Sequence, residues 1–259
     1  MYRSVRDSTL VHTKGYFNNI KAFTGYYDPD TYISGNSVEA ALFAAGAVIE
    51  AIDRCKKVEI ERGFCAVRPP GHHAEADRAM GFCIFNNVAI GARYAQKIGY
   101  KKAFIIDFDV HHGNGTQHIF EEDNTVFYFS THQYPHYPGT GTSSERGKGK
   151  GEGFTYNIPL KYGSGDNDYI HIYNEILPNL IRNFCPDIII VSAGYDIHEK
   201  DPLSDINVSN EGIRGIVRGI VSCSLHAGRS IPVIFSLEGG YNLHALSESV
   251  MITLSEMLT

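Results

Sequence analysis

The chain has 259 residues, of which 43% are hydrophobic and 20% charged. This length and composition fit one α/β domain with a substantial core, and they exclude fibrous and disordered proteins. The formal net charge of -6 argues against direct nucleic-acid binding and is compatible with a cationic substrate. The five cysteines form no Cys-x-x-Cys pair, and we find neither a signal peptide nor an apolar run of membrane-spanning length. We therefore expect a soluble, cytoplasmic protein without a disulfide framework.

Short apolar runs alternate with amphipathic segments along the chain. In chain order, the pattern predicts helix 37–55 capped by Ser37, strand 64–67, helix 86–98 ended by Gly99, strands 103–106 and 126–129, a flexible loop 139–153, helix 166–184, strand 187–191, helix 209–227, strand 232–237 and helix 242–258. This alternation predicts an α/β fold with three α/β/α layers and a central, mostly parallel sheet. We predict a single domain over residues 1–259, with ligands bound beyond the carboxyl ends of the strands.

Acidic residues and histidines follow two of these strands. After strand 103–106, Asp107, Asp109 and His111 point to one side if the strand continues, and a carboxylate with an imidazole can ligate zinc at about 2.0–2.2 Å. Asp196 follows strand 187–191 and could supply a third ligand, leaving a position open for water. Taken alone, the first group could be a capping Asp beside surface histidines, and Asp196 could equally be a helix N-cap.

Two further strand ends carry groups suited to catalysis. His72 and His73 lie on a Pro-Gly loop after strand 64–67, and imidazoles can act as acids and bases near neutral pH. Tyr241 follows a Gly-Gly pair after strand 232–237 and could donate a hydrogen bond to an oxyanion. Either motif alone could be an ordinary loop. Together, the four strand ends favour metal-assisted attack of water on a carbonyl.

Six blocks of sequence resemble the signatures of the histone deacetylases, and they fit the class II and bacterial deacetylase-like branch best. They are Arg-Pro-Pro-Gly-His-His-Ala-Glu (68–75), Gly-Phe-Cys (81–83), Asp-Phe-Asp-Val-His-His-Gly-Asn-Gly-Thr (107–116), Pro-Gly-Thr-Gly (138–141), Ala-Gly-Tyr-Asp (193–196) and Glu-Gly-Gly-Tyr-Asn (238–242). The resemblance runs from about residue 9 to the C-terminus and implies an arginase/deacetylase-like catalytic domain. The family usually begins with a further strand and a His-Pro-Glu loop, so we expect one wall of the mouth to be absent or supplied by another subunit, which would make the protein an oligomer.

The resemblance implies a role for each polar residue of these blocks. It implies one Zn²⁺ per subunit, with Fe²⁺ as the alternative, on Asp109, His111 and Asp196. His72 and His73 are expected to act as general base and acid, oriented by Asp107 and Asn114, while Tyr241 stabilises the oxyanion. The residues expected to contact substrate are Gly81, Phe82, Tyr137, Leu203 and Asp30. Structural K⁺ is expected at Asp107, Asp109, His111, Ser130 and Thr131, and at Phe120, Asp123, Val126 and Phe154.

These roles predict a zinc-dependent amidohydrolase that deacetylates N-acetyl-lysine in proteins or peptides and releases acetate. The alternative is an acetylpolyamine or other small-molecule deacetylase. Relatives specific for polyamines tend to carry a Glu near the Asp-Pro pair where this chain has Leu203, which favours an acyl-lysine or another less cationic substrate. A non-catalytic acyl-lysine binder is the third hypothesis. The additional ligands of the two-metal ureohydrolases are not found.

Overall fold

The computed structural model describes residues 9–226 and 229–259. A six-stranded sheet forms its centre, and every neighbouring pair of strands is parallel. The spatial order of the strands is β3 (Arg62–Cys65), β10 (Val233–Leu237), β7 (Ile188–Ala193), β4 (Ala103–Asp107), β5 (Val126–Gln133) and β6 (Thr155–Leu160). Five of these strands were predicted within a few residues. The missed strand, β6, is at the edge of the sheet and is only partly buried, so its sequence is not a continuous apolar run.

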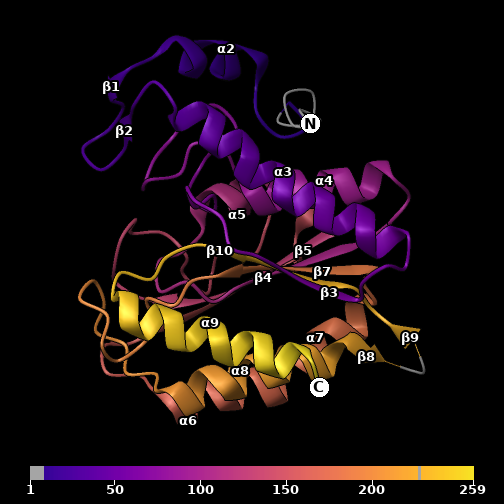
Figure 1. Ribbon diagram of the computed structural model, residues 1–259. Helices are drawn as coiled ribbons and strands as arrows, with labels where there is room; N and C mark the ends of the chain where they lie inside the picture. Colours follow the sequence, from indigo (N-terminus) through magenta and orange to yellow (C-terminus); the bar gives the residue numbers. More distant parts are fainter. Residues whose placement is uncertain (1–8, 227–228) are drawn as a thin grey trace.

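Helices cover both faces of the sheet, which confirms the predicted three-layer α/β/α architecture (Figure 1). One face carries α3 (Ser37–Lys56), α4 (Asn87–Lys97) and α5 (Asn114–Phe120), and α2 (Lys14–Ala22) lies on the same side, farther from the sheet. The other carries α6 (Asp166–His171), η2 (Ile172–Ile176), α7 (Leu177–Phe184), α8 (Asn210–Ser224) and α9 (Leu243–Met257). Four short strands form two hairpins, β1 (Gly25–Tyr26) with β2 (Tyr32–Ile33) and β8 (Leu225–His226) with β9 (Arg229–Ser230).

Helix boundaries follow local hydrogen bonding. Asn86, Ser209 and Asn242 each cap a helix through a side-chain oxygen that accepts a backbone N–H of the first turn. Ser37 was wrongly predicted as a cap, since Asn36 occupies that position and the Ser37 hydroxyl oxygen instead accepts the N–H of Ser34. The end predicted for helix 209–227 falls on a residue outside the described part, and α8 ends at position 224.

The predicted helix 166–184 is interrupted by the π-helical turn η2. Pro178 lies in the first turn of α7 and has no N–H, so the regular helical ladder loses a donor at this point. The predicted loop 139–153 contains only the short 3-10 helix η1 (Gly149–Gly151). Glu145 anchors this loop by accepting the N–H groups of Gly141 and Thr142.

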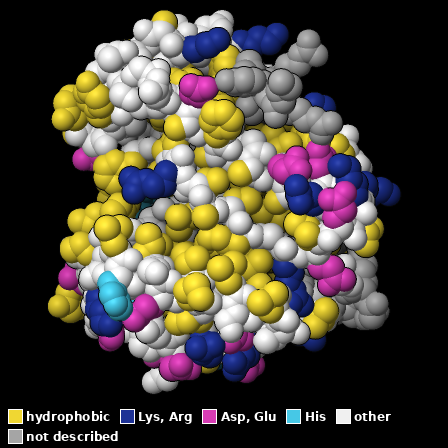
Figure 2. Space-filling model, viewed as in Figure 1, with side chains coloured by type: hydrophobic (Ala, Val, Ile, Leu, Met, Phe, Trp, Pro, Cys, Tyr) yellow, Lys and Arg dark blue, Asp and Glu magenta, His cyan; other side chains and the backbone are white. Residues whose placement is uncertain are grey.

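The sheet separates two hydrophobic clusters because successive side chains of a strand point to opposite faces. Ile105 and Ile190 pack toward α3 and α4, while Phe104 and Val191 pack toward α8. Four cysteines are buried and Cys185 is exposed, all of them free. Hydrophobic side chains also gather on the outer surface over α9, where Leu243 and Met251 are exposed (Figure 2). Because β4, β7 and β10 are parallel neighbours, their carboxyl ends lie together at one edge of the sheet.

Candidate active site

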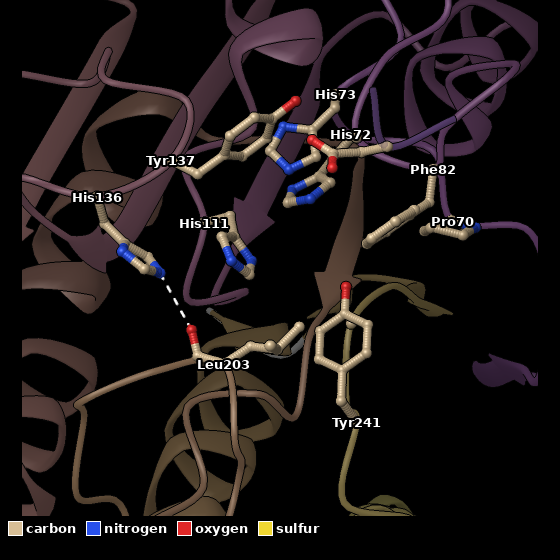
Figure 3. Close-up of a pocket in the computed structure, with 12 residues that line it drawn as sticks. Pro70, His72, His73, Phe82, His111, His136, Tyr137, Leu203 and Tyr241 are labelled. Atoms are coloured by element: carbon tan, nitrogen blue, oxygen red, sulfur yellow. Dashed lines mark hydrogen bonds between the residues drawn. The ribbon is translucent and has the colours of Figure 1, made fainter. Parts of the chain in front are cut away.

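A pocket of about 340 Å³ opens at this edge. Every residue predicted to contact substrate lies around it, together with His72, His73, His111 and Tyr241 (Figure 3). The full lining is Asp30, Pro70, His72, His73, Gly81, Phe82, His111, His136, Tyr137, Leu203, Gly239 and Tyr241. Sequence reasoning missed His136, whose ring stacks on His111 at 5.1 Å between centroids and whose Nε2 donates to the Leu203 carbonyl at 3.1 Å. Its only signal in the sequence was its place beside Tyr137.

Three predicted metal ligands meet at the base of the pocket. His111 Nδ1 lies 3.1 Å from Asp109 Oδ1 and 3.1 Å from Asp196 Oδ2, and all three ligand atoms are within 4.8 Å of one another. Bonds of about 2.0–2.1 Å to a tetrahedral Zn²⁺ place two ligand atoms about 3.3 Å apart. The donor set and its spacing therefore fit a divalent metal with three protein ligands and one open position.

The backbone around this triad holds its carboxylates in place. Asp196 Oδ1 accepts the N–H of Val110 at 2.9 Å, and Asp109 Oδ2 accepts the N–H of Gly239 at 2.8 Å. A Cβ atom at Gly194 would lie 2.1 Å from Asp109 Oδ2, so only glycine allows this close approach. Burial and the neighbouring Asp109 carboxylate raise the pKa of Asp196, as expected for two buried like charges close together.

The tandem histidines occupy two different electrostatic environments. His72 Nδ1 donates to Asp107 Oδ2 at 3.1 Å, and its Nε2 lies 3.8 Å from Asp109 Oδ1. Burial by itself lowers the pKa of His72, but the two carboxylates raise it to about 10. His73 Nδ1 donates instead to the amide oxygen of Asn114 at 2.8 Å. Burial, with the neighbouring His72 and His111, holds the pKa of His73 well below its ordinary value.

The upper pocket is walled by aromatic rings. Phe82 and Tyr241 face each other across 6.2 Å between ring centroids, and the Tyr241 hydroxyl points toward the histidines (Figure 3). Phe82 adopts a left-handed backbone conformation with φ of 67°, and its N–H donates to Thr31 Oγ1 at 3.1 Å. On the other side, the Tyr137 ring lies 5.1 Å from that of His73. Burial raises the pKa of Tyr241 above its ordinary value, so its hydroxyl keeps its proton at neutral pH.

The residues predicted to hold potassium form two groups. In the first, Asp107 and Ser130 are paired in register between β4 and β5, the Ser130 hydroxyl bonds His132, and the Thr131 hydroxyl bonds Tyr173. In the second, the N–H of Asp123 donates to the Phe120 carbonyl, and the Phe154 carbonyl accepts the N–H of Tyr128. Val126 begins β5 beside this turn. Potassium at either place stays a prediction.

A parallel α/β sheet with a pocket at its carboxyl edge, lined by four imidazoles and two tyrosines beside a pair of buried aspartates, belongs to the arginase-like class of hydrolase folds. The chain is a member of the histone deacetylase family, since the family model for the histone deacetylase domain matches residues 3–257. It therefore has the fold and the family membership of a deacetylase.

Named relatives agree with this assignment. The chain is 43% identical to "Histone deacetylase 14, chloroplastic" of Arabidopsis thaliana over 95% of this chain and 62% of that protein. It is 41% identical to a "Probable deacetylase" of Archaeoglobus fulgidus over 93% of this chain and 67% of that protein. The crystal structure of the HDA15 HD domain superposes with a TM-score of 0.91 at 37% identity, covering 98% of this chain and 74% of the other.

The chain spans 62% and 61% of the length of two chloroplastic plant relatives, from Arabidopsis thaliana and Oryza sativa. Because both are named chloroplastic, the cytoplasmic location expected above stays a prediction. Among the described residues, no helix combines the length and the apolar character that a membrane crossing requires.

Proposed function

We propose that this chain is a zinc-dependent deacetylase that hydrolyses the acetyl amide of N-acetyl-lysine in proteins or peptides. The observation that carries the proposal is the meeting of the Asp109, His111 and Asp196 triad with His73 and Tyr241 in one pocket. Zn²⁺ on this triad, or Fe²⁺ in its place, would supply a Lewis acid for the acetyl carbonyl and would lower the pKa of water.

His73 is the group that we assign to proton transfer. Its Nδ1 is committed to Asn114, which leaves Nε2 with a lone pair, and its low pKa keeps the ring neutral before the reaction. His73 would take a proton from water as the oxygen attacks the acetyl carbon, and would return it to the amine nitrogen as the C–N bond breaks. The products are acetate and the free amine.

Two other side chains would stabilise the charge that develops. Tyr241 would donate its hydroxyl hydrogen to the tetrahedral oxyanion. His72, between Asp107 and Asp109, would stay protonated and act as a fixed positive charge beside the reacting carbon. We therefore assign both the base and the acid role to His73, where the sequence alone suggested a division between the two histidines.

The shape of the pocket favours a long, apolar acyl-amine side chain. Phe82 and Tyr137 would flank its methylene groups, and the Asp30 carboxylate at the mouth would accept N–H groups of the substrate backbone. Leu203 lies at the rim with 45% of its surface exposed and offers no carboxylate for a polyamine nitrogen. This apolar residue favours acetyl-lysine over acetylspermidine.

The test is turnover of an acetyl-lysine peptide and of N-acetylspermidine by the same zinc- or iron(II)-reconstituted protein. We expect metal-dependent release of acetate, with kcat/KM higher for the peptide, and release slowed about 10²- to 10³-fold in Tyr241→Phe. Preference for the polyamine would overturn the substrate assignment. Absence of turnover from both substrates, with one metal bound per chain, would overturn the proposed activity and favour a binding role.

A further inference from the structure

A chain of hydrogen bonds runs from His73 away from the pocket to the protein surface. The His73 Nδ1–H donates to Asn114 Oδ1 at 2.8 Å, and Asn114 Nδ2 donates to Glu75 Oε1 at 2.6 Å. The same Glu75 oxygen is 2.9 Å from Nδ1 of His118. His73, Asn114 and Glu75 are buried, whereas 41% of the His118 side chain is exposed. His73 is thus connected to solvent through a buried amide and a buried carboxylate.

Nitrogen donors from three side chains converge on Glu75. Besides Asn114 and His118, the Arg78 guanidinium approaches Oε1 with Nη2 at 3.8 Å. The Glu75 backbone is fixed as well, because its N–H donates to the Arg78 carbonyl and its carbonyl accepts a hydrogen bond from His12 Nδ1 at 2.9 Å. These contacts hold the carboxylate in one place as an acceptor.

An ionised carboxylate can only accept hydrogen bonds, so it selects one of the two orientations of the neighbouring amide. With its NH₂ group toward Glu75, Asn114 must present its oxygen to His73, and that oxygen must be met by an N–H. With the amide reversed, two oxygens would face each other at 2.6 Å across the Glu75 contact, and the NH₂ group would meet Nδ1 of His73. The proton of the neutral imidazole would then move to Nε2.

We propose that Glu75 is a positioning residue that sets the tautomer of His73. By fixing the Asn114 amide, Glu75 keeps the proton of His73 on Nδ1 and leaves the lone pair of Nε2 facing the pocket. That lone pair is what a general base requires. The catalytic consequence rests on the proposed function, but the tautomer is a property of the folded chain and can be measured without turnover.

A double-mutant cycle of near-isosteric substitutions tests the proposal. Wild type, Glu75→Gln, Asn114→Asp and the double variant are compared, with Glu59→Gln as a control because Glu59 is exposed and remote from the pocket in the described structure. Glu75→Gln removes the charge that selects the amide orientation, so we expect kcat to fall about 10- to 100-fold with KM almost unchanged. The control should retain the wild-type kcat.

The double variant shows whether the effect of Glu75→Gln on kcat changes direction when residue 114 is a carboxylate. Asn114→Asp alone places two carboxylates side by side, so we expect kcat at least 10-fold below wild type. Adding Glu75→Gln replaces the repulsion by an amide that donates to the new carboxylate at position 114, and we expect kcat to rise at least 10-fold above that of Asn114→Asp alone. Glu75→Gln is thus harmful beside an amide and beneficial beside a carboxylate. Equal effects in both backgrounds would show that the two residues act independently and would overturn the proposal.

A second readout is the ¹⁵N chemical shifts of the His73 ring, which distinguish a protonated nitrogen from one with a lone pair. We expect Nδ1–H in the wild type and in the double variant, and a shift toward Nε2–H in Glu75→Gln. Nε2–H in the wild type, or no change in Glu75→Gln, would overturn the proposal even if the enzyme is active. The expected tautomers in a protein without turnover would support the positioning role and refute only the proposed activity.

Discussion

The most direct test of the metal site is the substitution Gly239→Ala, which adds a single methyl group beside the ligands. A Cβ atom there would lie 2.2 Å from Asp196 Oδ2 and 2.7 Å from Asp109 Oδ2, whereas a Cβ essentially never comes within 3.0 Å of a heavy atom outside its own and the adjacent residues. One carboxylate would have to move by about 0.8 Å, and metal–ligand bonds tolerate deviations of about 0.2 Å. Because both carboxylates are buried, we expect Gly239→Ala to lose a ligand.

The loss of a ligand should exceed the 10- to 100-fold cost of mutating residues that only orient the ligands, so we expect zinc affinity to fall by at least about 100-fold. The φ angle of Gly239 lies outside the left-handed region, so alanine does not strain the backbone there. Zinc affinity is measured by competition with a chromophoric chelator, and the far-UV circular dichroism spectrum reports whether the fold is retained.

The control is Gly35→Ala, because a Cβ at Gly35 would have no atom within 4 Å apart from those of its own and the adjacent residues. It should bind zinc like the wild type. If Gly239→Ala binds one zinc per chain with an affinity within about threefold of wild type, the metal does not depend on the placement of Asp109 and Asp196, and our assignment of the ligands is wrong.

Three further outcomes are expected. Tyr241→Phe should lower kcat by about 10²- to 10³-fold with zinc content and KM nearly unchanged; steady-state kinetics check this, and a loss below tenfold would argue against an oxyanion donor. Burial lowers the pKa of His12 to about 4, below its value in the unfolded chain, so the stability from neutral His12 is complete above pH 6.5 and is lost as the pH falls toward 4. Between pH 7 and 4.5, the free energy of unfolding measured in urea should fall by about 2–3 kcal/mol less for His12→Gln than for the wild type. An identical fall in both proteins would contradict the lowered pKa of His12. Leu203→Glu should raise kcat/KM for N-acetylspermidine relative to the acetyl-lysine peptide by about 10-fold, and an unchanged ratio would show that this rim position does not select the substrate.

The central strands and the polar blocks that follow them could be predicted from the sequence. β4, β7 and β10 are buried on both faces, so each begins with a run of at least three apolar residues that the sequence pattern reveals. The edge strand β6 and the short helices α2 and α5 carry weaker patterns and were missed. In α5, Gly115 is required because a Cβ would lie 2.2 Å from the Ala74 carbonyl oxygen. This requirement comes from a tertiary contact, and glycine itself gives no sequence signal for a helix.

The distances inside the site were decided only by the tertiary structure. Asp196 is 85 residues from His111 in the chain, yet its carboxylate is 3.1 Å from the imidazole because β4 and β7 are neighbours in the sheet. The contacts of Glu75 could not be predicted from the sequence either. Glu75 follows the tandem histidines in the chain, but its partners Asn114 and His118 come from α5. The residue types of the site are local properties of strand ends. Which of them touch depends on strand order and helix packing, which no local pattern encodes.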